Sequence, residues 1–221
     1  MTQTISHSKE PIRLFHSDFL EFFTHIHPAV VAVVWGPVAL IFLGLAVAGR
    51  PGDVSPLYIP AAFVIGALIW TLAEYTLHRF LFHFRPRNAW QERLSFLMHG
   101  VHHAQPMEKS RLVMPPPVSI PLAVVFYFIF RLLVGGLLGV QLWVAPLFSG
   151  FVAGYLAYDL IHYSLHHVRL PAGYPQFLRR HHMQHHSQLP MSRYGVSSPL
   201  WDYVFGTEPG MKPQTNTDQQ R

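Results

Sequence analysis

Four apolar stretches constrain the fold of this 221-residue chain more than any other feature. They cover residues 28–48, 57–77, 118–140 and 142–163. At ~1.5 Å per residue, a helix of such a stretch is roughly 30 Å long, which matches the hydrocarbon core of a bilayer. Only 12% of the residues are charged, against about 25% in a typical soluble domain. The sequence therefore predicts an all-α integral membrane protein with four transmembrane helices.

The basic residues predict how these helices are oriented. Fourteen of the sixteen Lys and Arg residues lie in segments 1–27, 78–117 and 164–221, and the exceptions are Arg50 and Arg131. Because cytosolic loops carry the excess of basic residues, both termini and the 78–117 loop are expected in the cytosol. This topology suits a bacterial inner membrane or the endoplasmic reticulum. The third and fourth spans are expected to form a tight hairpin.

The chain divides into three predicted parts. Residues 1–27 form a cytosolic lead, in which "PIRLFHSDFLEFFTHI" carries apolar residues at helical spacing. This pattern favours an interfacial amphipathic helix, with a core helix of a cytosolic cap as the alternative. Residues 28–209 form one domain, and the polar tail 210–221 is expected to be disordered.

Composition excludes several classes of site. The chain has no cysteine, which excludes disulfides, thiolate metal sites and iron–sulfur clusters. The pI is about 9.7, but the basic residues flank apolar spans and do not form a separate basic domain. We therefore expect a membrane surface as the partner of this charge, and no nucleic acid.

Histidine is the most over-represented residue, with sixteen in the chain. Twelve of them lie between His78 and His186, all at predicted cytosolic ends of spans or in cytosolic segments. "HGVHH" and "HMQHH" place histidines at i, i+3 and i+4 of a helix, and "HYSLH" places a pair at i and i+4. The pair in "HRFLFH" is five residues apart and needs a helix end or a bend to converge. The candidate metal ligands are His78, His83, His99, His102, His103, His162, His166, His182, His185 and His186.

Ten imidazoles predict two metal ions, because one ion takes roughly four to six ligands. Glu74 and Asp159 precede His78 and His162 by one helical turn, so each is expected to accept a hydrogen bond from its neighbour's free ring N–H. His167 and His181 are interpreted as spare members of histidine doublets. The histidines of the lead are expected to belong to no site.

These motifs resemble the fatty acid hydroxylase superfamily of membrane proteins, and within it the fatty acid 2-hydroxylases. The resemblance covers residues 70–207. It rests on "EYTLHRFLFH", "HGVHH", "RLVMPPPVSIP", "YLAYDLIHYSLHH", "HHMQHH" and "YGVSSPLWDYVFGT", in that order.

The resemblance implies a four-helix membrane domain over residues 28–209, under a cytosolic helical cap whose ten histidines hold two metal ions. Iron is expected in function, and zinc is possible in a purified form. The implied reaction uses O₂ and two electrons to hydroxylate C2 of a long acyl chain, free or in a sphingolipid.

Some relatives carry a fused cytochrome b5 domain. Here 27 residues precede the first span, and His27-Pro28 is not followed by the two glycines of a haem motif. A separate electron donor, such as a cytochrome b5-like or ferredoxin-type protein, is therefore expected.

The same residues allow two other interpretations. A sterol-type desaturase or hydroxylase of the same superfamily would share the histidine cap. A metal-binding or transport protein of the membrane would need ligands along a path through the bilayer, whereas these histidines lie at the ends of spans.

Residues 111–121 are expected to shape the mouth of an acyl slot, with a rigid linker as the alternative. Trp201, Asp202 and Phe205 are expected to form either a lid or ordinary cap packing.

Overall fold

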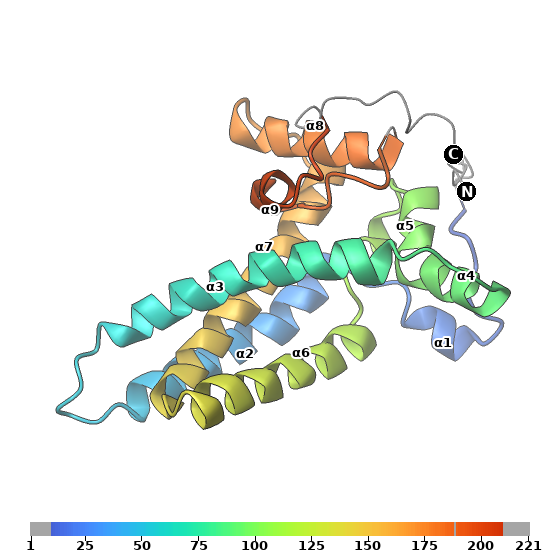
Figure 1. The fold of residues 1–221 in the computed structure, drawn as a ribbon. Helices are drawn as coiled ribbons and strands as arrows, with labels where there is room; N and C mark the ends of the chain where they lie inside the picture. The colour runs from blue at the N-terminus through green and yellow to red at the C-terminus, as the bar shows by residue number, and fades with distance from the viewer. Residues whose placement is uncertain (1–9, 188, 210–221) are drawn as a thin grey trace.

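A computed structural model describes residues 10–187 and 189–209, and in these residues the chain consists of helices and loops without strands (Figure 1). Four helical segments are long and apolar enough to cross a membrane: Pro28–Ala48, Tyr58–Phe82, Lys109–Leu137 and Gln141–His167. The prediction of an all-α protein with four such helices is confirmed. The predicted tail lies outside the described residues.

The four segments are built from regular and π-helical parts. The first is α2 (Pro28–Ala48), and the second is α3 (Tyr58–Thr76) with the π-helix η1 (Leu77–Phe82). The third contains η3 (Lys109–Arg111), α6 (Pro116–Phe130) and the π-helix η4 (Arg131–Leu137). The fourth joins η5 (Gln141–Trp143) to α7 (Val144–His167). The short connection between the third and fourth segments agrees with the expected hairpin.

Helix α7 is the centre of the bundle and packs against α2 and α3. The backbones of α7 and α3 come close together at two glycines, Gly150 of α7 and Gly66 of α3. A Cβ atom on Gly150 would lie only 1.9 Å from the Phe63 carbonyl oxygen. A Cβ atom on Gly66 would lie 2.0 Å from the Leu147 carbonyl oxygen. Small residues permit such close contact between membrane helices, where dispersion and polar contacts replace the hydrophobic effect. The Ser149 hydroxyl adds a hydrogen bond to the Ala39 carbonyl of α2, at 2.7 Å.

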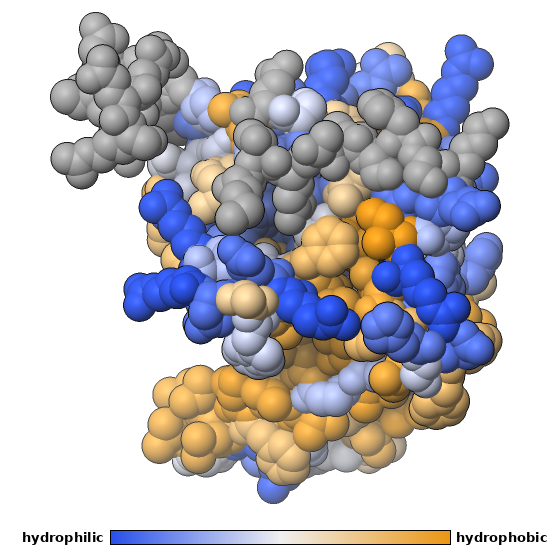
Figure 2. Space-filling model, turned by 90° about the vertical axis from the view of Figure 1, so that its right-hand side faces the viewer, coloured by the Kyte–Doolittle hydropathy of each residue, from blue (hydrophilic) through white to orange (hydrophobic). Residues whose placement is uncertain are grey.

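The outer faces of the bundle are apolar. Large side chains such as Val33 of α2 and Phe128 of α6 are exposed. Figure 2 shows a hydrophobic lower surface beneath a layer rich in hydrophilic residues. An apolar surface of this extent is suited to lipid, so the chain is a multi-pass membrane protein.

Short helices gather at one end of the bundle, opposite the 49–57 loop (Figure 1). They are α1 (Asp18–Phe22), α4 (Ala89–Ser95), the π-helix η2 (Phe96–Gly100), α5 (Val101–Ala104), α8 (Tyr174–Ser187) and α9 (Leu200–Val204). We call this end the cap. The ten candidate ligands lie in the cap helices or at the ends of the membrane helices that meet the cap.

The helix expected in the N-terminal lead is much shorter than its apolar pattern suggests. Residues 11–15 are not helical, and α1 begins only after Ser17, whose hydroxyl accepts a hydrogen bond from the Leu20 N–H. The physical reason is Glu21, whose carboxylate accepts hydrogen bonds from the N–H groups of Leu14 at 3.0 Å and Phe15 at 2.9 Å. These bonds hold residues 14 and 15 against the side chain of Glu21 in α1. The chain before Ser17 therefore does not extend the helix.

The glycine contact between α3 and α7 gives a direct test of the packing. Gly150→Ala should lower the free energy of unfolding by about 3 kcal/mol or more, because the new methyl group meets backbone that cannot move aside. Gly44→Ala is the matched control, because a Cβ atom there meets nothing within 4 Å. Thermal unfolding in detergent measures both. Equal unfolding temperatures for the two variants would contradict the close helix contact.

Candidate metal centre

The ten candidate histidines converge from four segments into two groups. In each group, five ligand atoms lie within 4.8 Å of one another. The first group is His78, His83, His99, His103 and His185, and the second is His102, His162, His166, His182 and His186. Nine of the ten side chains are buried, and His83 is half-buried. The predicted residues therefore lie together, and the structure adds a division between them.

A π-helix brings the widely spaced pair together. The N–H of His83 donates a hydrogen bond to the His78 carbonyl, at 3.1 Å, across η1. A π-helix bonds residue i to residue i+5, so a side chain five positions along lies almost above the first. This is the bend that the spacing in "HRFLFH" requires.

The two H-x-x-H-H motifs are divided between the groups in a reciprocal way. In "HGVHH", His99 and His103 join the first group, whereas His102 joins the second. In "HMQHH", on α8, the i and i+4 residues join the second group, and the i+3 residue joins the first. Each group thus receives a pair from the end of a membrane helix, a pair from one cap helix and a single ring from the other. Spacings of i, i+3 and i+4 lie on one face of a helix, but the structure divides each triplet between the two groups.

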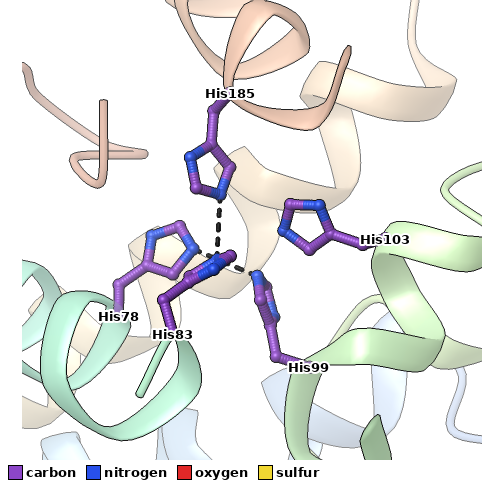
Figure 3. A group of neighbouring side chains, drawn as sticks. All are labelled: His78, His83, His99, His103 and His185. Atoms are coloured by element: carbon purple, nitrogen blue, oxygen red, sulfur yellow. Dashed lines mark hydrogen bonds between the residues drawn. The ribbon is translucent and has the colours of Figure 1, made fainter. Parts of the chain in front are cut away.

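The distances between ring nitrogens fit a shared ion. In the first group, Nε2 of His78 lies 3.0 Å from Nε2 of His99, and Nε2 of His83 lies 3.1 Å from Nε2 of His185. Figure 3 shows these rings directed toward one centre, together with that of His103. Two nitrogens that each bind an ion at about 2.1 Å, at a right angle, are about 3.0 Å apart.

The second group repeats this geometry. Nε2 of His102 lies 3.0 Å from that of His162, and Nε2 of His182 lies 2.9 Å from that of His166 and 3.0 Å from that of His186. A neutral ring nitrogen either donates one hydrogen or offers one lone pair. His182 Nε2 therefore cannot form full hydrogen bonds to both neighbours, whereas one ion can bind all three nitrogens. The residues present thus fit two ions with nitrogen ligands.

Burial keeps the cap imidazoles in the form that binds metal. Desolvation and the neighbouring rings His185 and His103 lower the pKa of His83 to about 2. Desolvation also lowers the pKa of His185 to about 4, against the opposing hydrogen bond to Ser192. The pKa values of His102 and His182 are lowered well below the usual value by burial and then by other histidines. Neutral imidazoles offer a lone pair to a metal ion.

Backbone carbonyls of one loop orient two of the rings. Nδ1 of His78 donates to the Tyr194 carbonyl at 2.5 Å, and Nδ1 of His185 donates to the Ser192 carbonyl at 2.7 Å. With the hydrogen fixed on Nδ1, the lone pair of Nε2 faces the centre of the group. Sequence reasoning missed these two partners, because a carbonyl acceptor is the same in every residue type.

Glu74 and Asp159 do not make the hydrogen bonds expected from their spacing, as far as the described residues show. Glu74 accepts from the N–H groups of Val196 at 2.6 Å and Ser197 at 2.8 Å, and from the Ser197 hydroxyl. It therefore holds the loop whose Tyr194 carbonyl orients His78, one step away from the ring. Asp159 accepts from the Met114 N–H at 3.3 Å.

The remaining histidines described by the structure lie outside both groups. His181 Nε2 is 3.0 Å from the Glu208 carboxylate, while His27 accepts the Ala29 N–H at the start of α2. His25 Nδ1 is 2.6 Å from the Ser110 hydroxyl.

In the α9 region, Trp201 donates to the Thr71 hydroxyl at 2.9 Å, and Phe205 stacks on Tyr75. This contact with α3 agrees with the cap-packing alternative for the α9 region.

A mostly apolar cavity of about 390 Å³ reaches both groups of histidines. Its wall includes His99 of the first group and His102 and His162 of the second. Figure 2 shows hydrophobic residues in a hollow below the hydrophilic layer. The segment expected to shape an acyl slot does line this cavity, because most of residues 111–118 contribute to its wall.

Comparisons with known proteins agree with these features. The family model described as fatty acid hydroxylase matches residues 63–207. The dihydroceramide fatty acyl 2-hydroxylase FAH2 of Arabidopsis thaliana is 37% identical, over 90% of this chain and 81% of its own length. The ceramide very long chain fatty acid hydroxylase SCS7 of Saccharomyces cerevisiae is 40% identical, over 86% of this chain and 48% of its own. A solved structure of full-length scs7p, in which only the hydroxylase domain is visible, has a TM-score of 0.79 at 38% identity, covering 89% of this chain and 72% of that one.

Adjacent histidines of α8 provide a matched pair of variants. His182→Ala should lose bound metal, because it removes a nitrogen that has two ring neighbours at close range. His181→Ala should keep the wild-type metal content while lowering the thermal stability, because it removes contacts with Glu208, Asp202 and Phe177 but no ring of either group. Elemental analysis of purified protein measures the metal. Equal metal loss in both variants would contradict the division of this doublet.

Proposed function

Because the chain belongs to the fatty acid hydroxylase family, we propose that it is a di-iron monooxygenase that hydroxylates a long-chain acyl group at C2. The acyl group is either a free fatty acid or part of a sphingolipid. The relatives named above, whose names specify acyl 2-hydroxylation and ceramide substrates, support this proposal.

One observation carries the proposal, namely that histidines of both groups form part of the wall of the apolar cavity. His99, His102 and His162 belong to its wall, while most of the remaining wall is apolar. An acyl chain is the kind of ligand that such a cavity suits. A chain lying in it would place one of its carbon atoms beside both groups of imidazoles.

The ten histidines would hold the two ions, five in each group. Iron bound there would supply the redox chemistry with O₂ that an unactivated C–H bond requires, whereas zinc would fit the same nitrogens without that chemistry. The chain itself keeps these imidazoles neutral, orients two of them through Tyr194 and Ser192, and excludes water by burial. The apolar wall holds the substrate chain in place.

Hydroxylation at C2 sets where the lipid head must lie. C2 is bonded to the carbonyl carbon, so the polar head stays near the cap while the chain extends along the apolar wall. Polar side chains of the wall, among them Thr24, Arg111 and Tyr158, are candidates to meet this head. The lipid reaches the cavity from the bilayer.

The reaction also needs two electrons, which a separate donor such as a cytochrome b5-like or ferredoxin-type protein would deliver. We place the cap and both termini in the cytosol, on the strength of the basic residues, in a bacterial inner membrane or the endoplasmic reticulum. His83 is the one candidate ligand that is only half-buried. A donor on the cytosolic side would therefore approach the first group of histidines there.

Expression in a host that lacks 2-hydroxy lipids tests the function. With iron, a reductase and an electron donor supplied, the wild-type chain should produce 2-hydroxy acyl lipids that mass spectrometry detects. The His182→Ala variant is the inactive control. Hydroxylation at another carbon, or no hydroxylated product in metal-loaded wild-type protein, would refute the assignment to C2.

A further inference from the structure

The N-terminal segment, which we define as residues 12–25, forms part of the cavity wall. Its contributing residues are Leu14, Phe15, Leu20, Phe23 and Thr24. The family match begins only at residue 63, so this part of the wall lies outside it. The N-terminal segment therefore contributes a feature of the cavity that the matched domain does not contain.

A buried arginine holds the N-terminal segment in place. The Arg111 guanidinium, whose side chain is 3% exposed, donates to the Glu21 carboxylate and to the Ile12 carbonyl. One of its nitrogens also lies 2.9 Å from His25 Nε2. Burial opposes the charge of Glu21, but the N–H groups of Phe15 and Leu14 and the Arg111 charge lower the pKa of this carboxyl below its usual value.

Further hydrogen bonds attach the start of the N-terminal segment, and the residue that follows its end, to the chain between α5 and α6. The Gln105 side chain accepts from the Ile12 N–H at 2.8 Å. At the other end, the Ile26 N–H donates to the Ser110 carbonyl at 2.7 Å. This loop follows the helix that carries His102 and His103. The wall is thus fixed relative to the histidines and is not a loosely attached terminus.

The phenylalanines of the N-terminal segment have two different environments. Phe15 and Phe23 belong to the cavity wall, whereas Phe19 and Phe22 are each 71% exposed. Phe23 is packed edge-on against Phe19, with ring centroids 5.1 Å apart, and against Phe22, at 5.5 Å. A ring restrained in this way presents a fixed surface to whatever occupies the cavity.

We propose that the N-terminal segment is a specificity-determining wall of the acyl cavity, and that Phe15 and Phe23 limit the width of the chain that fits. This proposal rests on the proposed function. A straight saturated chain is narrow, whereas a cis double bond bends the chain and widens the space that it needs. Aromatic rings along one side therefore favour the saturated chain.

The test is a competition between stearoyl and oleoyl substrates, which have the same length, and the measured quantity is the ratio of their 2-hydroxylated products. Phe15→Ala and Phe23→Ala widen the cavity and should raise the oleoyl-to-stearoyl ratio by about tenfold. This value is the lower end of the range expected for a change of shape in an apolar pocket. Trp90→Ala and Phe128→Ala remove exposed aromatic rings that lie outside the cavity wall, so they are the controls and should leave the ratio at its wild-type value. Metal content and thermal stability of all four variants are measured alongside.

A ratio that stays at the wild-type value in all four variants, or that rises equally in lining and exposed variants, would overturn the proposal while leaving the hydroxylase function intact. A wild-type protein without any 2-hydroxy product would instead overturn the proposed function, and this proposal with it. If the lining variants do not fold, cross-linking of the wild type with a diazirine-bearing acyl chain decides the matter. Label within residues 12–25 supports the wall, and label confined to other segments contradicts it.

Discussion

The structure depends above all on the packing of ten imidazoles, nine of them buried, side by side at one end of a membrane bundle. A buried polar ring is costly unless its nitrogens have partners. Here nine of the ten rings have a nitrogen 2.9–3.1 Å from that of another ring, a spacing that suits ligands of a common ion. The helix ends, the π-helical turn of η1 and the loop after α8 all place rings at these positions. The cap can therefore be understood as a scaffold for two clusters of nitrogen ligands.

The exchange of rings between the two groups ties the cap together. Each H-x-x-H-H helix gives its i and i+4 rings to one group and its i+3 ring to the other. Because neighbouring helix positions point about 100° apart, a single short helix can lie between two centres and serve both. Loss of one cap helix would then disturb both groups at once. The arrangement also brings both groups to a single cavity, where one acyl chain can meet them.

Much of this could be predicted from the sequence, and the exceptions have a common cause. The four apolar helices follow from length and hydropathy, and the ten histidines follow from spacings that repeat. The division into two groups could not be predicted, since it depends on where α5 and α8 lie relative to each other. The roles of Glu74, Tyr194 and Ser192 were missed because they arise from contacts across more than a hundred residues or from backbone carbonyls. The short α1 results from Glu21 bonding to the chain before it, a local competition that an apolar pattern does not reveal.

The central claim is that these ten histidines form two separate nitrogen-ligand sites in one chain. Iron stoichiometry combined with X-ray absorption spectroscopy on the purified, iron-reconstituted protein tests it most directly. The account predicts two iron ions per chain, each with imidazole nitrogens at about 2.1 Å as its main ligands. A single ion per chain, or a shell dominated by carboxylate oxygen, would contradict it.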